Sequence, residues 1–232
     1  MRALMTAALA AVIATGSGAE RAQAEECGLE LILALDVSGS VDRREYALQI
    51  GGLAAAFEDD RVGRVIDTVD GGILVTMTQW SGASRQSQSI GWHHVTDDAS
   101  RLALAAAIRA APRTWRNFST ALGEALVHAH AIGADAPMAC RRKVIDVSGD
   151  GVSNEGRPPG PVSLAVAASG YTINALVIRG AVPDPVEHFE HQVIAGPAAF
   201  IEIAEGFDDY PEAILRKLLR EIDRPMIVSD RR

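Results

Sequence analysis

The stretch Leu29–Asp42, LELILALDVSGSVD, decides the fold. Its first seven residues form an almost entirely apolar run, which has the length and composition of a strand buried on both faces. The run ends in a carboxylate, Asp36, and a short polar turn follows. A helix is then expected from Asp42 to Phe57, with Asp42 as its N-cap. A buried strand that leads through a polar turn into a helix is the unit from which parallel sheets are built.

The rest of the chain repeats this alternation of short apolar runs and helical stretches. Further strands are expected at 73–80, 90–95, 143–148, 171–178 and 199–203. Further helices are expected at 97–111, 121–132, 185–194 and 210–222, and one more helix follows the loop 149–161 and ends at 168. The Ser, Gly and Gln residues of 81–89 indicate a hairpin loop, so strand 90–95 is expected to run antiparallel to 73–80. The pattern predicts one α/β domain, residues 25–223, with a doubly wound, mostly parallel six-stranded sheet, helices on both faces and one antiparallel edge strand, as in Rossmann-like folds. About six helices are expected, and residues 224–232 form a polar tail.

The first 24 residues have the pattern of a cleaved secretory signal peptide. Arg2 precedes an apolar run over 3–14, and Ala22-Gln23-Ala24 supplies the small residues that signal peptidase recognises. The alternative is a membrane anchor, but a membrane span needs roughly 20 apolar residues, and this run is shorter. Cleavage after Ala24 is therefore expected, which predicts a periplasmic or secreted protein.

Composition excludes several functional classes. The 232 residues are 48% hydrophobic and 22% charged, as in an ordinary globular protein. With 22 basic and 30 acidic side chains, the formal charge is −8, which argues against binding to nucleic acid or to anionic membranes. Two cysteines are too few for a disulfide-dense scaffold or a four-thiolate zinc site.

Two acidic turns follow strands of the predicted sheet. Asp36 is followed by Ser38 and Ser40 at alternate positions, and the segment Ser148-Gly149-Asp150-Gly151 follows the strand 143–148. In an open parallel sheet, ligands bind at the carboxyl ends of the strands, where the strand order reverses. Carboxylates and hydroxyls without Cys or His form a hard oxygen site, which suits a small hard cation such as Mg²⁺.

These residues resemble the von Willebrand factor type A (vWA) domain and its metal-ion-dependent adhesion site. The family pattern Asp-x-Ser-x-Ser is matched by Asp36, Ser38 and Ser40. The Thr that the family places before a mid-chain helix is matched by Thr120, and the later Asp-Gly by Asp150 and the glycine after it. The strings DVSGSVD and VIDVSGDG are similar to a bacterial family of exported, uncharacterised vWA-like proteins. The resemblance covers essentially the whole mature chain.

The resemblance implies a non-enzymatic binding module. Ser38, Ser40 and Thr120 would contact the ion, Mg²⁺ or else Mn²⁺ or Ca²⁺, while Asp36 and Asp150 would hold it largely through water. One coordination position would stay open for a carboxylate of a partner protein. Because few charged groups would contact the ion directly, it would stay electrophilic and attract that carboxylate. The partner would approach a protein of its own charge sign, so the ion is expected to supply the local attraction.

One departure from the family pattern leaves alternatives open. The family usually has Thr-Asp-Gly where this chain has Ser148-Gly149-Asp150-Gly151, so the inserted glycine bears on the placement of Asp150. Asp146, in the middle of the expected strand, is the alternative ligand. The same residue is the general base that a metal-dependent hydrolase would need, which is the alternative function. A structural domain with a vestigial site is the third hypothesis.

The two cysteines are placed for a disulfide bond. Cys27 lies nine residues before Asp36, and Cys140 lies ten before Asp150. If the two strands are neighbours with their carboxylates at one end, the cysteines reach the same level at the other end, since each residue rises roughly 3.3 Å. The alternative, two free thiols, is disfavoured in an oxidising exported compartment.

Overall fold

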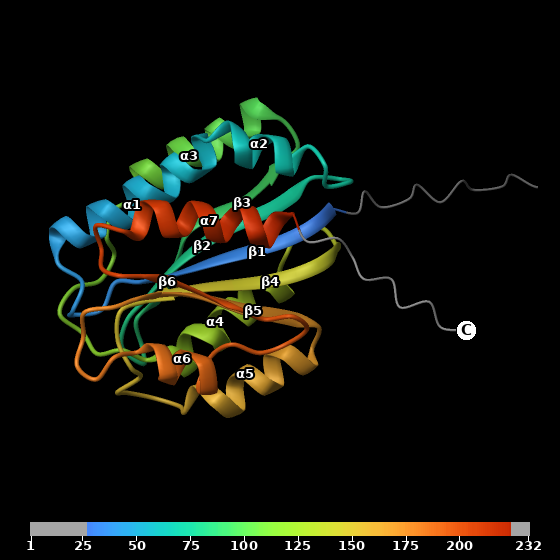
Figure 1. Ribbon diagram of the computed structural model, residues 1–232. Coiled ribbons are helices and arrows are strands. Elements are labelled where there is room, and N and C mark those ends of the chain that lie inside the picture. Colours follow the sequence, from blue (N-terminus) through green and yellow to red (C-terminus); the bar gives the residue numbers. More distant parts are fainter. Residues whose placement is uncertain (1–26, 224–232) are drawn as a thin grey trace, which may run out of the picture.

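A six-stranded sheet runs through the middle of the protein (Figure 1). The structure is a computed structural model that describes residues 27–223, so the expected signal peptide (1–24), residues 25–26 and the tail 224–232 lie outside the described residues. The strands are β1 Cys27–Asp36, β2 Ile73–Trp80, β3 Gln86–Val95, β4 Cys140–Gly149, β5 Tyr171–Ile178 and β6 Ile201–Ala204. Within 27–223, no helix combines the length and the apolar character that crossing a membrane requires.

The strand order places β1 and β4 side by side at the centre of the sheet. The order is β3-β2-β1-β4-β5-β6, and every pair is parallel except β2 with β3. The chain winds outward from β1 to one edge and then from β4 to the other, so the order reverses between these two strands. This is the doubly wound sheet with one antiparallel edge strand that the sequence predicts.

Helices cover both faces of the sheet, as Figure 1 shows. One face carries α1 Arg43–Glu58, α2 Asp60–Ile66, α3 Asp98–Ala110 and α7 Tyr210–Ile222, and the other carries α4 Leu122–Ala134, α5 Pro159–Ala168 and α6 Val186–Gln192. Side chains of β1 alternate between the two cores: Leu31 and Leu33 pack with the first set, and Ile32 and Ala34 with the second. Every residue of β1 is buried, which explains its continuous apolar run.

Some boundaries differ from the expectation. The strand predicted at 90–95 begins at Gln86, because the polar residues before Ile90 pair with β2 along the half-exposed sheet edge and leave a loop of only 81–85. Helix α2 was not predicted; it is seven residues long and begins at its own N-cap, Asp59, directly after α1. The strand β4 is longer than 143–148 at both ends. The expected N-cap Asp42 is confirmed, and with Glu45 it forms a capping box.

The predicted disulfide is confirmed and closes the end of the β1–β4 pair that lies opposite Asp36. Cys27 and Cys140 are register partners, their Cα atoms are 4.4 Å apart and their sulfur atoms are bonded. The bond joins residues 113 positions apart, so it fixes the two central strands to each other covalently.

A buried ion pair attaches α7 to the centre of the sheet. Lys217 Nζ lies 2.6 Å from Asp146 Oδ1 and 3.2 Å from Glu221 Oε2, and all three side chains are buried. Asn174 on β5 donates its Nδ2 hydrogen to Glu221 Oε1 at 2.7 Å. Burial raises the pKa of Asp146 to about 7, against the attraction of Lys217. Asp146 therefore belongs to the α7 side of the sheet as a structural group.

We expect Lys217→Met to lower the free energy of unfolding by about 3–5 kcal/mol, because it leaves two buried carboxylates without a cation. The matched control is Arg216→Met on the same helix, whose half-exposed ion pair with Glu202 is worth at most about 1 kcal/mol. Urea denaturation measures both variants. Equal losses in the two variants would contradict this structural role.

Candidate metal centre

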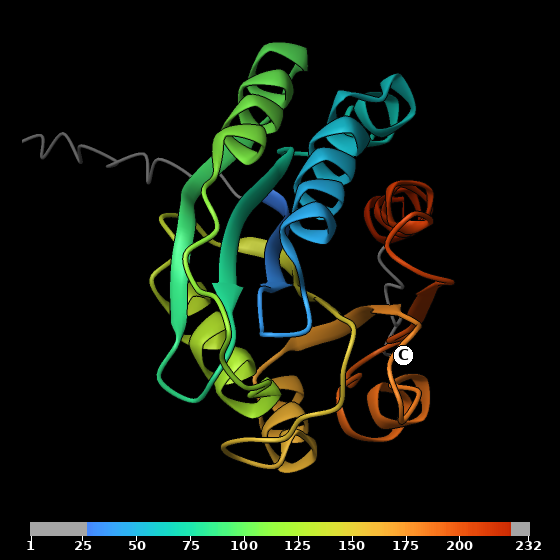
Figure 2. The same ribbon diagram turned by 90° about the vertical axis from the view of Figure 1, so that its left-hand side faces the viewer.

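The candidate site lies at the carboxyl edge of the sheet, where β1 and β4 end. Figure 2 turns this edge toward the viewer, with the loops after the parallel strands in front. Leu35 pairs with Ser148, so Asp36 and Gly149 are the next residues at this edge. The reversal of strand order between β1 and β4 lets the two following loops diverge to opposite faces.

Asp36 is fully buried, and only one of its two carboxylate oxygens has a hydrogen-bond partner among the described residues. Its Oδ1 accepts a hydrogen bond of 2.7 Å from the backbone N–H of Ser38. Its Oδ2 is buried without a hydrogen-bond partner among the residues that the structure describes. A buried carboxylate oxygen without a partner is costly, so the position is suited to an added cation or a water that a cation holds.

The two serines connect the first acidic turn to the second. Ser38 Oγ and Ser40 Oγ are 3.2 Å apart, and Ser40 Oγ donates to Asp150 Oδ1 at 2.8 Å. Asp36, Ser38, Ser40 and Asp150 are therefore joined in one chain of hydrogen bonds, although the two acids are separated by more than a hundred residues. The inserted glycine therefore does not keep the Asp150 carboxylate away from Ser40.

Thr120 reaches the same edge through backbone contacts rather than through its hydroxyl. It lies just before α4 and is nearly buried. Its N–H donates to Asn154 Oδ1 at 2.9 Å, and its carbonyl accepts from Asn154 N–H at 2.9 Å, which ties it to the loop after β4. Two residues earlier, the carbonyl of Phe118 accepts from Gly39 N–H at 2.8 Å, which ties the same loop to the turn after β1.

Gly149, the glycine that departs from the family pattern, packs closely beside Asp36. A Cβ atom at this position would lie 3.1 Å from Phe189 Cζ and 3.2 Å from Asp36 Oδ2. The absence of a side chain therefore lets the end of β4 pass closely beside the buried carboxylate. The glycine is visible in the sequence, but only the structure shows that it lies beside Asp36 Oδ2.

Arg113 is a functional candidate that the sequence did not reveal. Its Nη2 donates to the carbonyls of Val37 and Ser38, both at 2.9 Å, so the guanidinium holds the turn that carries the serines. The contact joins residues 76 and 75 positions apart, and no local spacing signals it.

An added positive charge would stabilise the charged forms of the two acids at the site. Burial raises the pKa of Asp36 to about 7, and the neighbouring Asp150 adds to this, while the hydrogen bonds from Ser38 and the charge of Arg113 lower it. Burial also raises the pKa of Asp150. No group of three or more His, Cys, Asp or Glu residues that could hold a metal ion occurs within 27–223. An ion here would depend on hydroxyl ligands, and the residues present fit a hard cation.

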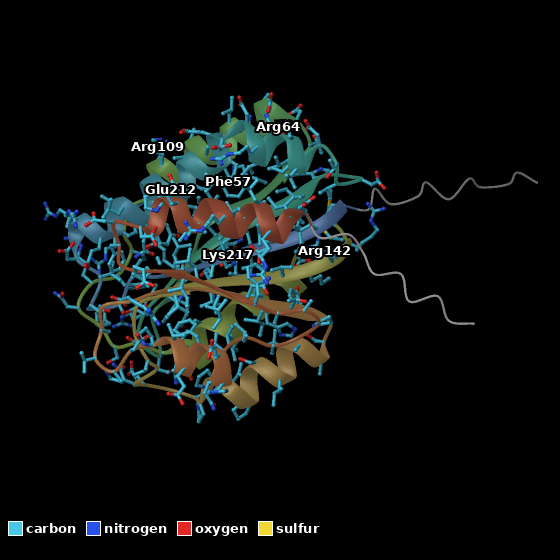
Figure 3. All side chains as sticks on the ribbon, in the orientation of Figure 1. Phe57, Arg64, Arg109, Arg142, Glu212 and Lys217 are labelled. Carbon is cyan, nitrogen blue, oxygen red and sulfur yellow. A yellow bond between two sulfur atoms is a disulfide. The ribbon has the colours of Figure 1, made fainter. Side chains whose placement is uncertain are left out.

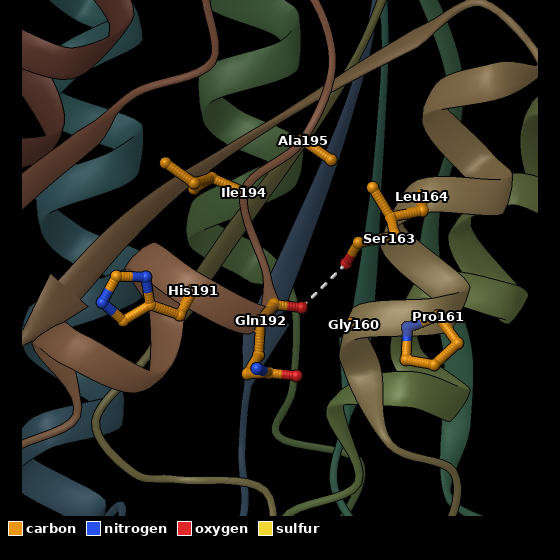
Figure 4. A pocket seen from close by; sticks show the side chains of 8 residues that line it. All are labelled: Gly160, Pro161, Ser163, Leu164, His191, Gln192, Ile194 and Ala195. Carbon is orange, nitrogen blue, oxygen red and sulfur yellow. Dashed lines mark hydrogen bonds between the residues drawn. The ribbon is translucent and has the colours of Figure 1, made fainter.

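A hollow lies away from this site, between α5 and α6. It measures about 270 Å³ and is lined by Gly160, Pro161, Ser163, Leu164, His191, Gln192, Ile194 and Ala195 (Figure 4). Ser163 Oγ donates to the carbonyl of Gln192 at 3.1 Å, so this hydroxyl already has a partner. The lining contains no carboxylate, and none of its residues belongs to the chain of hydrogen bonds around Asp36.

Solved structures share this fold at low sequence identity. The chain is similar to proximal thread matrix protein 1 from the mussel byssus, with a TM-score of 0.62, 16% identity, and coverage of 86% of this chain and 47% of that chain. A structure of the same mussel protein with a zinc-occupied metal-ion-dependent adhesion site matches with a TM-score of 0.58 and 17% identity, over 85% of this chain and 46% of that chain. A von Willebrand factor type A protein from Catenulispora acidiphila matches with a TM-score of 0.57 and 17% identity, over 85% of this chain and 42% of that chain. The chain thus spans less than half the length of these proteins.

No curated protein matches the sequence. A family model does match, over residues 26–226, which is most of the chain. The protein therefore has the fold of a vWA domain and belongs to the family described as "Protein of unknown function (DUF1194)".

Proposed function

We propose that the protein is a vWA-type binding module that holds a divalent cation and uses it to capture a carboxylate of a partner protein. The residues that would hold the ion are Asp36, Ser38, Ser40, Thr120 and Asp150. The observation that carries the proposal is the buried Oδ2 of Asp36, which has no hydrogen-bond partner among the described residues and lies in a turn linked to Asp150. Two neighbouring buried carboxylates with raised pKa values need a cation to be stable in their charged forms.

The donor set favours Mg²⁺, with Mn²⁺ or Ca²⁺ as substitutes. Serine and threonine hydroxyls and carboxylates are hard oxygen donors, and Mg²⁺ commonly uses few protein carboxylates and keeps several waters. The zinc-occupied site of the mussel protein supports the view that this fold can carry a divalent ion at such a motif. The bound ion would supply a local positive charge that attracts a carboxylate from outside.

An exported location agrees with the disulfide. The bond between Cys27 and Cys140 is stable in an oxidising compartment such as the periplasm or the extracellular space. We infer that residues 1–24 are a signal peptide removed after Ala24, which would leave Cys27 close to the mature N-terminus.

A binding function is favoured over a metal-dependent hydrolase. The general base that such an enzyme would take from the sequence, Asp146, is paired at 2.6 Å with Lys217 on the α7 side of the sheet. Asp146 is the register partner of Leu33, three residues before Asp36, and its carboxylate contacts α7, so it is not placed to accept a proton from a water at the site. The other carboxylates at the site, Asp36 and Asp150, are assigned to the ion.

We expect the wild-type protein to bind Mg²⁺ and Mn²⁺ in calorimetry, and Asp36→Ala and Ser38→Ala to weaken both by at least about tenfold, because each removes an oxygen of the site. The matched control is Thr68→Ala, which removes an exposed hydroxyl that only donates to the carbonyl of Val65. Circular dichroism checks that each variant is folded. Unchanged affinity in folded Asp36→Ala would overturn the proposal.

Asp36→Asn should stabilise the metal-free protein at pH 8. The folded-state pKa of Asp36 is raised to about 7, so its proton stabilises the fold at low pH and this stabilisation is lost as the pH rises through 7. In EDTA, we expect the variant to be about 1–3 kcal/mol more stable than wild type at pH 8, with a smaller difference at pH 5.

Thermal unfolding measures this difference. Added Mg²⁺ should raise the melting temperature of the wild type at pH 8 and leave that of Asp36→Asn unchanged, since ligands stabilise only the state that binds them. A variant less stable than wild type in EDTA at pH 8 would show that Asp36 is not an uncompensated charge.

A further inference from the structure

Three arginines lie on the two loops beside the candidate metal centre. Arg85 is in the loop between β2 and β3, and Arg113 and Arg116 are in the loop between α3 and α4, which leads to Thr120. The segment 112–120, PRTWRNFST, contains no acidic residue. This cationic rim, defined as Arg85, Arg113 and Arg116, stands out in a chain with a formal charge of −8.

The rim is held in place around the site. The Arg85 guanidinium lies over the rings of Trp115 and Phe118, 5.3 and 4.7 Å from their centres. Ser81 Oγ donates to the carbonyl of Ser119 at 3.0 Å, which joins the two loops directly. Because the Phe118 carbonyl also accepts from Gly39 N–H, the stack is fixed to the turn that carries Ser38 and Ser40. Cation–π contact of this kind orders an arginine without neutralising it.

The rim arginines form no ion pair with the acids of the described part of the chain. Many other arginines are, namely Arg44, Arg61, Arg101, Arg109, Arg141, Arg157, Arg179 and Arg216. Within 27–223, no carboxylate oxygen lies within 4.0 Å of the side-chain nitrogens of Arg85, Arg113 or Arg116.

The hydrogen bonds given for the rim arginines go to neutral acceptors. Arg85 Nη1 donates to the carbonyl and Oγ of Ser84, at 3.2 and 2.9 Å, and Arg113 Nη2 donates to two backbone carbonyls, so these bonds do not balance either charge. The acid of the neighbouring loop, Glu155, uses its Oε2 to accept from Ala83 N–H at 3.0 Å.

The positive charges are close enough to affect one another. Burial lowers the pKa of Arg113, and the charge of Arg116 lowers it further, while Asp36 acts in the opposite direction. A divalent ion would balance Asp36 and Asp150, and the rim would then be left with an excess of positive charge. An approaching acidic segment would be attracted both by the ion and by the rim.

We infer that the partner segment carries at least two acidic side chains, one that binds the ion and a second that pairs with Arg85 or Arg116. This inference rests on the proposed function, because the first carboxylate needs the ion. It goes further by giving the partner a sequence character: a cluster of acidic residues rather than one isolated Asp or Glu. It also adds the rim to the ion as a second source of local attraction.

Capped peptides of equal length with one or with two glutamates, the rest Gly and Ser, provide the test. Each is titrated into isotope-labelled protein in Mg²⁺ and in EDTA, and NMR shift changes give the affinities. In Mg²⁺ the second glutamate should tighten binding by about two- to fivefold, which is the effect of one partly exposed ion pair. The gain should shrink at high salt.

Three variants test whether the gain in affinity from the second glutamate comes from the rim arginines. Arg116→Gln removes an exposed side chain and should reduce the gain from the second glutamate, and Arg85→Gln/Arg116→Gln should abolish it. Arg64→Gln is the matched control: this arginine is also exposed and lies on α2 (Figure 3), which leads to Val69 beside Gly28, at the end of β1 opposite Asp36. It should keep the full gain.

The outcomes separate the two claims. If the one-glutamate peptide binds in Mg²⁺ but not in EDTA, and the second glutamate adds nothing, the proposed function stands and the inference is wrong. The inference is also wrong if the gain persists in the double variant. If the one-glutamate peptide shows no Mg²⁺-dependent binding, both claims fail together.

Discussion

The structure depends on the parallel pairing of β1 with β4, which places two acidic turns at one edge of the sheet. The pairing carries Asp36 and Asp150 into a shared chain of hydrogen bonds with Ser38 and Ser40. Burial makes this arrangement unfavourable for two negative charges, as the raised pKa of Asp36 shows. A site that is costly in its charged form and lacks a partner for one oxygen is a site prepared for a cation.

The same strand pair is secured at its other end and on its flank. The disulfide joins the first residues of β1 and β4, and the Asp146–Lys217 pair attaches α7 to the middle of β4. The site therefore lies where rigid strands end: Asp36 is the last residue of β1, while the other proposed ligands and the rim lie in loops that follow the strands or lead into α4. This division is common in binding proteins, because a rigid scaffold orients the ligands and loops provide specificity.

Much of this could be predicted from the sequence, because the deciding signals are local. The bounds of β2, β5 and α7 agree with the apolar patterns, and the cysteine pair follows from spacings of nine and ten residues to the two acids. The start of β3 was missed because edge strands tolerate polar residues, and α2 because a seven-residue helix shows little periodicity.

The unpredicted parts of the site come from long-range contacts. Arg113 contacts the turn 75 residues before it, Asn154 holds Thr120 from the next loop, and Gly149 matters only because of the atom beside it. No spacing rule along the chain signals such contacts, since they depend on how loops pack after the sheet has formed. The five proposed ligands remain a prediction, for which the geometry supplies support.

A crystal grown with Mn²⁺ tests the central claim most directly, because the metal's anomalous scattering locates it without assumptions about its ligands. We predict a peak between the hydroxyls of Ser38, Ser40 and Thr120, next to the carboxylates of Asp36 and Asp150, with at least one coordination position that no protein atom fills. A map in which this position holds no peak at saturating Mn²⁺, or in which the ion lies elsewhere on the protein, would contradict it.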